Sequence, residues 1–218
     1  QADWLNAQGV TAFILMYRLP GEGWRQRENV PLQDAQRAMR LIRSRAQQFG
    51  IMPERVGVLG FSAGGHLAGS LATCHAEPVY APVDAADGLS ARPDIAGLIY
   101  PVISVDAPFT HEGSRAALLG QNPTEASRKA RSVELRVTDD TSPVFLMHAA
   151  DDGAVPVANS IALFQAMQAK ARPVALHVFE HGGHGFGVRL PASEPASIWP
   201  TLFAAFVARH GIFPPQQH

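Results

Sequence analysis

The sequence has 218 residues, a length that fits one domain with a sizeable buried core. Its hydrophobic fraction of 46% and charged fraction of 17% are typical of a compact folded protein and argue against disorder. The formal net charge is −1 without a cluster of lysines and arginines, so we expect no nucleic-acid partner. No apolar stretch approaches the roughly 20 residues that span a bilayer, so we expect no membrane partner either.

Short apolar runs alternate with stretches of helical spacing along the chain. The runs predict five buried strands at Val10–Leu19, Arg55–Phe61, Ile95–Val102, Val144–Ala150 and Pro173–Phe179. The stretches predict helices at Pro31–Phe49, Ser62–His75, Val157–Lys170 and Ala196–His210. Strands that are apolar on both faces and alternate with helices predict an α/β fold, with a mainly parallel sheet covered by helices on both faces.

Residues 104–142 lack a strand pattern. Two short helices are predicted there, near Ser114–Leu119 and Thr124–Ser132, in an excursion that roofs a site at the sheet edge. Because no repeat or interdomain linker is visible, residues 1–218 are expected to form one domain that includes this excursion as a short cap.

The start of the sequence and its cysteine content lead to two further expectations. The chain begins at Gln1 without a methionine or a signal-peptide pattern, so we expect a processed, trimmed or partial chain, and no compartment is indicated. The single cysteine, Cys74, excludes an internal disulfide and a zinc site with several thiolates. It lies in a predicted buried helix, where we expect it to act as a small core residue.

The most informative motif is Gly60-Phe61-Ser62-Ala63-Gly64, which contains Gly-x-Ser-x-Gly. It follows a predicted strand and precedes a predicted helix. To present a serine hydroxyl at the edge of a sheet, the chain must reverse within a few residues, which strains the serine backbone and needs small neighbours. Gly60 and Gly64 are predicted to be those neighbours, and Gly65 to let the helix pack closely. We therefore predict that Ser62 is a nucleophile.

A serine becomes nucleophilic when a histidine removes its proton and a carboxylate orients that histidine. In this architecture the acid precedes the histidine along the chain. Asp151 and Asp152 follow the fourth predicted strand, and a glycine-rich loop with His181 and His184 follows the fifth. The adjacent aspartates point apart, so only one can serve. We favour Asp152, with Asp151 as a turn former, and we favour His184 as the base, with His181 as its competitor.

The other histidines suggest different roles. His177, His181 and His184 together invite a metal-site interpretation, but a strand followed by a glycine loop lacks the helical face on which histidines converge. We therefore expect no metal, and His177 is interpreted as an ordinary strand histidine. His66 is too close to Ser62 in sequence to be the base, so we expect it to line the floor of the pocket. His181 and Asp151 are expected beside the catalytic groups.

These motifs resemble the α/β-hydrolase fold, and more narrowly its branch of acetyl esterases and acetylxylan-esterase-like carbohydrate esterases. The resemblance rests on the elbow at 60–68, the acid loop at 148–156 and the histidine loop at 181–186. Tyr17-Arg18 and residues 34–38 extend it along nearly the whole chain. It implies Ser62, Asp152 and His184 as the catalytic residues, an ester substrate and no cofactor.

The sequence departs from that family pattern at one point. The family carries a glycine-rich oxyanion loop upstream of a segment like Trp4-Leu5-Asn6, so we expect the N-terminal strands of the complete fold to be missing here. The backbone N–H of Ala63 is one oxyanion donor, and Gly21-Glu22-Gly23 follows the wrong strand to supply the second. Loss of one donor costs about 10²–10³ in rate, so we expect the chain to be either a fragment of a longer protein or an impaired hydrolase.

The leading hypothesis is a serine carboxylic ester hydrolase with an acyl-enzyme on Ser62. It removes short acyl groups, acetyl above all, from carbohydrate or small-alcohol esters, because the only cap material is the short excursion. A serine peptidase of the oligopeptidase type shares the motifs but needs a large gating domain. A non-catalytic hydrolase-fold binding protein fits the missing oxyanion loop but not the complete set of Ser62, Asp152 and His184.

Overall fold

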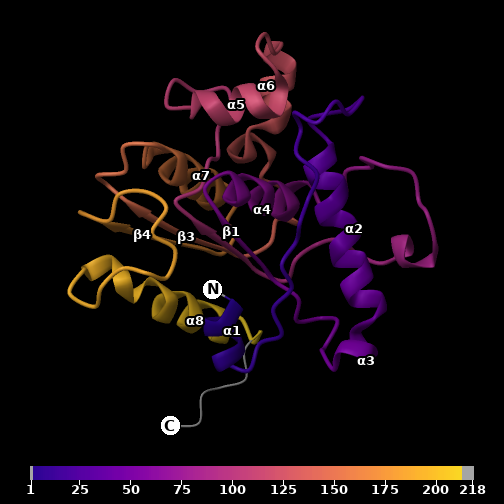
Figure 1. The fold of residues 1–218 in the computed structure, drawn as a ribbon, viewed down its shortest axis with the longest axis horizontal. Coiled ribbons are helices and arrows are strands. Elements are labelled where there is room, and N and C mark those ends of the chain that lie inside the picture. The colour runs from indigo at the N-terminus through magenta and orange to yellow at the C-terminus, as the bar shows by residue number, and fades with distance from the viewer. Residues whose placement is uncertain (1, 213–218) are drawn as a thin grey trace.

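A computed structural model describes residues 2–212, which form a parallel sheet between layers of helices (Figure 1). The strands lie in chain order as β1 (Val58–Phe61), β2 (Ala96–Ile99), β3 (Val144–Ala149) and β4 (Val174–Phe179). Each neighbouring pair is parallel, and the register aligns Gly60 with Leu98 and Leu98 with Leu146. The carboxyl ends of the strands therefore meet at one edge of the sheet.

Helices cover both faces of this sheet, as predicted. The long helices are α2 (Val30–Ser44), α4 (Ala63–Cys74), α7 (Ala158–Ala169) and α8 (Trp199–Arg209). Figure 1 shows α4 and α7 above the sheet and α8 below it. Leu98 and Leu163 belong to the core on the first face, and Phe145 and Trp199 to the core on the second. Burial of one such side chain contributes roughly 1.5–3 kcal/mol, so the two cores fix the sheet between its helices.

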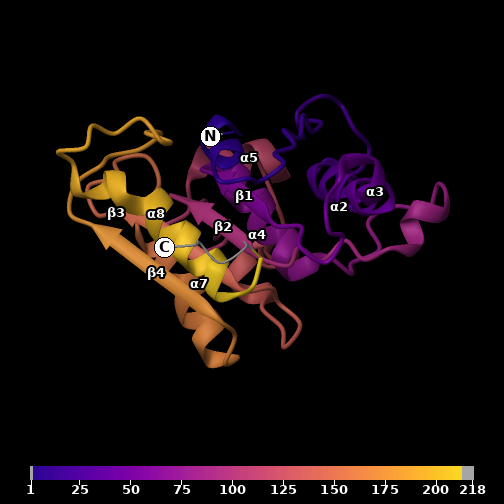
Figure 2. The same ribbon diagram turned by 90° about the horizontal axis from the view of Figure 1, so that it is seen from below.

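A third apolar cluster attaches α2 to the outer side of α4, and it contains Leu32 and Leu71. Cys74 is a buried free thiol in the same cluster, as its sequence context predicted. Figure 2 shows α2 and α3 (Ala46–Phe49) at the β1 side of the sheet, away from β4. None of the helices described within residues 2–212 is long and apolar enough to cross a membrane.

Several predicted helices end earlier or break. The predicted helix Pro31–Phe49 is two helices, because Arg45 leaves helical geometry at φ −111° and ψ 19° between α2 and α3. The excursion holds α5 (Glu112–Leu119) and α6 (Glu125–Arg131), close to their predicted places. The predicted helix Ala196–His210 begins as a 3₁₀ turn at Pro195–Ile198 before α8. The elements that the sequence pattern missed are α1 (Ala2–Ala7) and two further 3₁₀ turns at Ala85–Gly88 and Val133–Arg136.

The prediction of a strand at Val10–Leu19 is wrong. The segment pairs with no strand among the described residues, and β1 is bonded only to β2. Its apolar composition favours an extended chain, but a strand also needs a neighbouring backbone to bond. Ile14 and Met16 are accordingly 78% and 89% exposed. The segment is held instead by side chains: the Arg18 guanidinium forms an ion pair with Asp34 of α2 at 2.6 Å.

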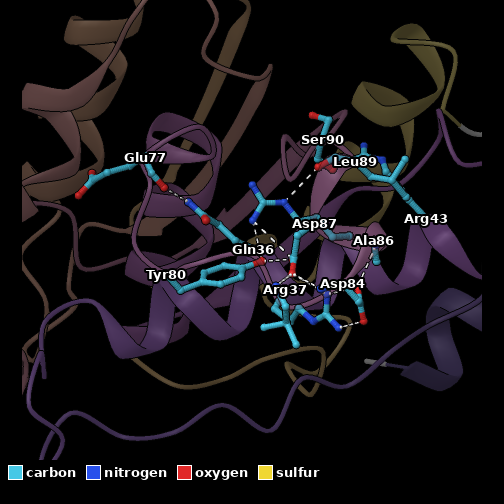
Figure 3. A network of polar contacts seen from close by, with 12 residues as sticks. Gln36, Arg37, Arg43, Glu77, Tyr80, Asp84, Ala86, Asp87, Leu89 and Ser90 are labelled. Carbon is cyan, nitrogen blue, oxygen red and sulfur yellow. Dashed lines mark hydrogen bonds and ion pairs between the residues drawn. The ribbon is translucent and has the colours of Figure 1, made fainter.

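A polar network holds the long connection between α4 and β2 against α2 (Figure 3). Arg37 binds both carboxylate oxygens of Asp84, at 2.8 and 2.6 Å. Arg40 donates to the Tyr80 hydroxyl at 2.6 Å, and that hydroxyl donates to Asp87 at the same distance. The bond from Tyr80 is the main reason why the pKa of Asp87 lies below its usual value. The network therefore orders a connection that has little regular structure of its own.

Two isoleucine variants test whether the sheet contributes more to stability than the extended segment at Val10–Leu19. Ile99 of β2 is fully buried, whereas Ile14 is mostly exposed. We expect Ile99→Ala to lower the free energy of unfolding by about 2–5 kcal/mol, because it leaves a cavity in the core. Ile14→Ala should change it by less than about 0.5 kcal/mol. Urea titration followed by circular dichroism measures both, and equal losses would place Ile14 in a core.

Candidate active site

Ser62 lies in the turn between β1 and α4, where its backbone adopts φ 53° and ψ −119°. This left-handed conformation is uncommon for a residue with a side chain, and it matches the strain expected at the elbow. The turn is held by the Ser62 carbonyl, which accepts from the N–H of Gly65 at 2.9 Å and of Val102 at 3.1 Å. The strained backbone is thus fixed from two directions and presents the hydroxyl at the edge of the sheet.

The glycines around Ser62 are not equivalent. A methyl group on Gly60 would overlap the carbonyl oxygen of Gly64 and lie 2.8 Å from Cβ of Ala68. A methyl group on Gly65 would lie 2.7 Å from Cβ of Pro101, so this glycine does permit close packing of α4. At Gly64 the same group would meet no atom within 4 Å. The expectation that Gly64 must be small is therefore not supported by the packing around it.

The structure brings Ser62, His184 and Asp152 together in one line of hydrogen bonds. Nε2 of His184 lies 2.8 Å from Oγ of Ser62, and Nδ1 lies 2.6 Å from Oδ2 of Asp152. A carboxylate only accepts, so Nδ1 carries the proton and Nε2 is free to accept from the serine hydroxyl. Oδ1 of Asp152 accepts from the N–H groups of Ala154 and Val155, both at 2.9 Å. The buried carboxylate is thereby fixed in position before it meets the imidazole.

Asp151 also binds the histidine loop, but through other residues than Asp152 does. Its Oδ1 accepts from the N–H of Gly183 at 2.8 Å, and its Oδ2 lies 3.2 Å from Nδ1 of the exposed His181. The bond from Gly183 is the largest cause that keeps the pKa of Asp151 below its usual value. Asp151 is thus more than the turn former that was expected, because it ties the residue before His184 to the acid loop.

Tyr100 is a residue of this site that the sequence analysis missed. It follows β2 with φ 38°, and its ring centre lies 4.8 Å from that of His184. Its hydroxyl accepts from the N–H of Gly187 at 2.9 Å, and burial raises its pKa. Tyr100 therefore supports the histidine loop at His184 and at Gly187. The only signal in the sequence was an aromatic residue at the end of a predicted strand, directly before Pro101.

A cavity of about 150 Å³ adjoins the elbow at Ala63. His66 lines it, and its Nε2 lies 2.8 Å from the carbonyl oxygen of Arg131. Burial is the main cause that lowers the pKa of His66. Ala117 and Leu118 of α5, which belong to the excursion, line the same cavity as Ala63. Most of the remaining lining is apolar and comes from 17–20, the start of α2, α4 and the loop after β2.

The three histidines that invited a metal interpretation have separate partners. His177 packs its ring on Phe145 at 5.1 Å, His181 contacts Asp151, and His184 contacts Ser62. Within residues 2–212, no group of three or more histidine, cysteine, aspartate or glutamate side chains is placed to hold a metal ion. The arrangement can instead move a proton between a hydroxyl and an imidazole that a buried carboxylate orients.

Comparison with known proteins agrees with this geometry. The family model BD-FAE matches residues 5–167. The chain belongs to the BD-FAE family. A crystal structure of an acetyl ester-xyloside bifunctional hydrolase from Caldicellulosiruptor lactoaceticus is 39% identical to it, with a TM-score of 0.89 over 98% of this chain and 76% of that one. The fold is that of an α/β hydrolase, as the sequence motifs implied.

Two curated relatives of this BD-FAE chain are longer. Endo-1,4-beta-xylanase B from Butyrivibrio fibrisolvens is 38% identical over 181 residues, which are 83% of this chain and 28% of the relative. An acetylxylan esterase from Xylanibacter ruminicola is 34% identical over 193 residues, which are 85% of this chain and 36% of the relative. The chain thus spans about a third of the length of each.

The packing of the elbow predicts opposite effects of alanine at two glycines. We expect Gly60→Ala to lower stability by about 1–3 kcal/mol and to displace Ser62, because the added methyl group overlaps backbone atoms. Gly64→Ala should leave both unchanged, since the space there is open. Urea titration and labelling by a fluorophosphonate probe report stability and the position of the serine. Similar behaviour of the two variants would contradict the described packing.

The buried His66 predicts how stability depends on pH. Burial lowers the pKa of His66 in the folded state below its usual value of 6.5. As the pH falls below 6.5, the unfolded state therefore binds more protons than the folded state does. Stability should therefore decrease on acidification, by up to about 1.4 kcal/mol per pH unit for this group. His66→Gln should show a shallower decrease. Urea midpoints at pH 7.5, 6.5 and 5.5 measure it, and identical slopes for the two proteins would refute the prediction.

Proposed function

We propose that this chain is a serine carboxylic ester hydrolase that forms an acyl-enzyme on Ser62. The observation that carries the proposal is the line of two hydrogen bonds from Asp152 through His184 to Ser62. Membership of the BD-FAE family and the names of the esterase relatives support the same chemistry.

The reaction follows from the positions of these atoms. Nε2 of His184 takes the proton of Ser62 as the hydroxyl attacks the ester carbonyl, and the same nitrogen then protonates the departing alcohol. Water repeats the two steps and releases the acid. Asp152 stays ionised throughout and holds the imidazole in the tautomer that can accept the serine proton.

The negative charge of the intermediate needs hydrogen-bond donors. Ala63 is the first residue of α4, and the first N–H groups of a helix have no partner within it. Its N–H is therefore available to the developing oxyanion, and the positive end of the helix dipole lies at the same place. We assign Ala63 as one donor.

The substrate class is the finer part of the proposal. The cavity beside Ala63 is small and roofed by α5, which favours short acyl groups, and acetyl above all. Two relatives carry acetyl esters or acetylxylan in their names, which favours an acetylated carbohydrate as substrate. We further propose that residues 1–218 act as one α/β-hydrolase domain, with residues 104–142 as its short cap.

Covalent labelling and hydrolysis test the nucleophile. We expect a fluorophosphonate probe to label the wild-type chain and p-nitrophenyl acetate to be hydrolysed, and Ser62→Ala to abolish both. Ser44→Ala is the matched control, because Ser44 is exposed at the end of α2 and should behave as the wild type. Labelling of Ser62 with cleavage of amide but not ester substrates would indicate a peptidase. Absence of labelling and of hydrolysis would leave a binding protein.

The size of the cavity predicts the preference for acyl chains. We expect kcat/KM to be higher for p-nitrophenyl acetate than for the octanoate ester, because the walls at Ala117 and Leu118 limit the space next to Ala63. A series from acetate to octanoate measures this preference. A rate that rises with chain length would contradict the assignment of this cavity to the acyl group.

A further inference from the structure

A second imidazole lies next to Asp152 and has no part in the mechanism described above. It belongs to His148, which lies in β3 four residues before Asp152. Both side chains are completely buried. Buried polar side chains are costly unless their hydrogen bonds are made, so the contacts of this ring decide what it does.

Both nitrogens of His148 have partners. Nδ1 lies 2.8 Å from Oγ of Ser160 in α7, and Nε2 lies 2.9 Å from the carbonyl oxygen of Val155. Nε2 also lies 3.3 Å from Oδ2 of Asp152. Because the carbonyl and the carboxylate only accept, Nε2 carries the proton, and the hydroxyl of Ser160 donates to Nδ1. The neutral ring therefore satisfies all its partners and joins β3, the acid loop and α7.

The surroundings keep this ring neutral. Burial is the main cause that lowers the pKa of His148, and a charge on His184 acts in the same direction. The carbonyl of Val155 and the charge of Asp152 oppose this effect. From α7 the ring meets the uncharged Ser160. A neutral imidazole does not compete with His184 for the charge of Asp152, but it still offers a fixed N–H.

Two sets of contacts therefore hold the acid loop. The N–H groups of Ala154 and Val155 bind Oδ1 of Asp152, and His148 binds the Val155 carbonyl and lies beside Oδ2. We propose that His148 is a positioning residue that holds the acid loop so that Oδ2 of Asp152 stays directed at Nδ1 of His184. This inference rests on the proposed hydrolase function and extends it to the residue behind the acid.

Three variants test it with p-nitrophenyl acetate. His148→Phe keeps a ring without its N–H, and we expect kcat to fall about 10- to 100-fold with KM little changed, because the reacting groups lose their alignment. The acid limb of kcat/KM should move to lower pH, since a displaced Asp152 stabilises the protonated His184 less. His148→Gln restores an N–H donor and should recover much of kcat. His177→Phe is the matched control in β4 and should resemble the wild type.

The outcomes separate this inference from the proposed function. A wild-type chain without hydrolysis or labelling would refute the function itself. An active wild type with a folded His148→Phe variant that keeps kcat and the acid limb would overturn the role of His148, as would equal losses in the Phe and Gln variants. If thermal melts show that His148→Phe does not fold, Ser160→Ala decides, because it removes only the donor to Nδ1. It should lower kcat in the same direction, and an unchanged kcat would overturn the proposal.

Discussion

The parallel register of the sheet is the constraint on which the site depends. Because β1, β3 and β4 run in the same direction, the residues that follow them emerge at one edge. Ser62, Asp152 and His184 are far apart in sequence, yet each follows one of these strands by a few residues. The buried strands fix the starting points of the three segments, so that the groups meet at distances of 2.6 and 2.8 Å.

The site also stores strain that the packing beneath it sustains. Ser62 and Tyr100 both adopt positive φ, and each such residue costs about 1–3 kcal/mol. They lie at the ends of neighbouring strands, β1 and β2, whose side chains enter the two buried cores. In these conformations the hydroxyl of Ser62 lies 2.8 Å from Nε2 of His184, and the ring centre of Tyr100 lies 4.8 Å from that of His184. The stability of the sheet thus keeps Ser62 and Tyr100 in backbone conformations that are uncommon for residues with a side chain.

Around the reacting groups, a second layer of polar contacts connects the loops to one another. Asp151 binds the N–H of Gly183, Tyr100 binds the N–H of Gly187, and His148 binds the carbonyl of Val155. The first two bonds link the histidine loop to the segments that follow β3 and β2, and the third links the acid loop to β3 itself. The loop that carries His184 is consequently held on both sides of this residue, at Gly183 and Gly187, and the loop that carries Asp152 is held at Val155.

The sequence by itself determined the fold class, and it predicted the elbow and the catalytic roles of Ser62, Asp152 and His184, because these depend on local patterns: apolar strands, glycines next to a serine, and acids or histidines after strands. It also placed α5 and α6 closely. Only the tertiary structure decided which extended run becomes a strand, since Val10–Leu19 has the composition of a strand but no neighbour to bond. The tertiary structure likewise decided that Gly60 is crowded and Gly64 is not, that Tyr100 contacts His184, and that His148 lies beside Asp152. Those facts depend on residues distant in sequence that packing brings together, and no local pattern records them.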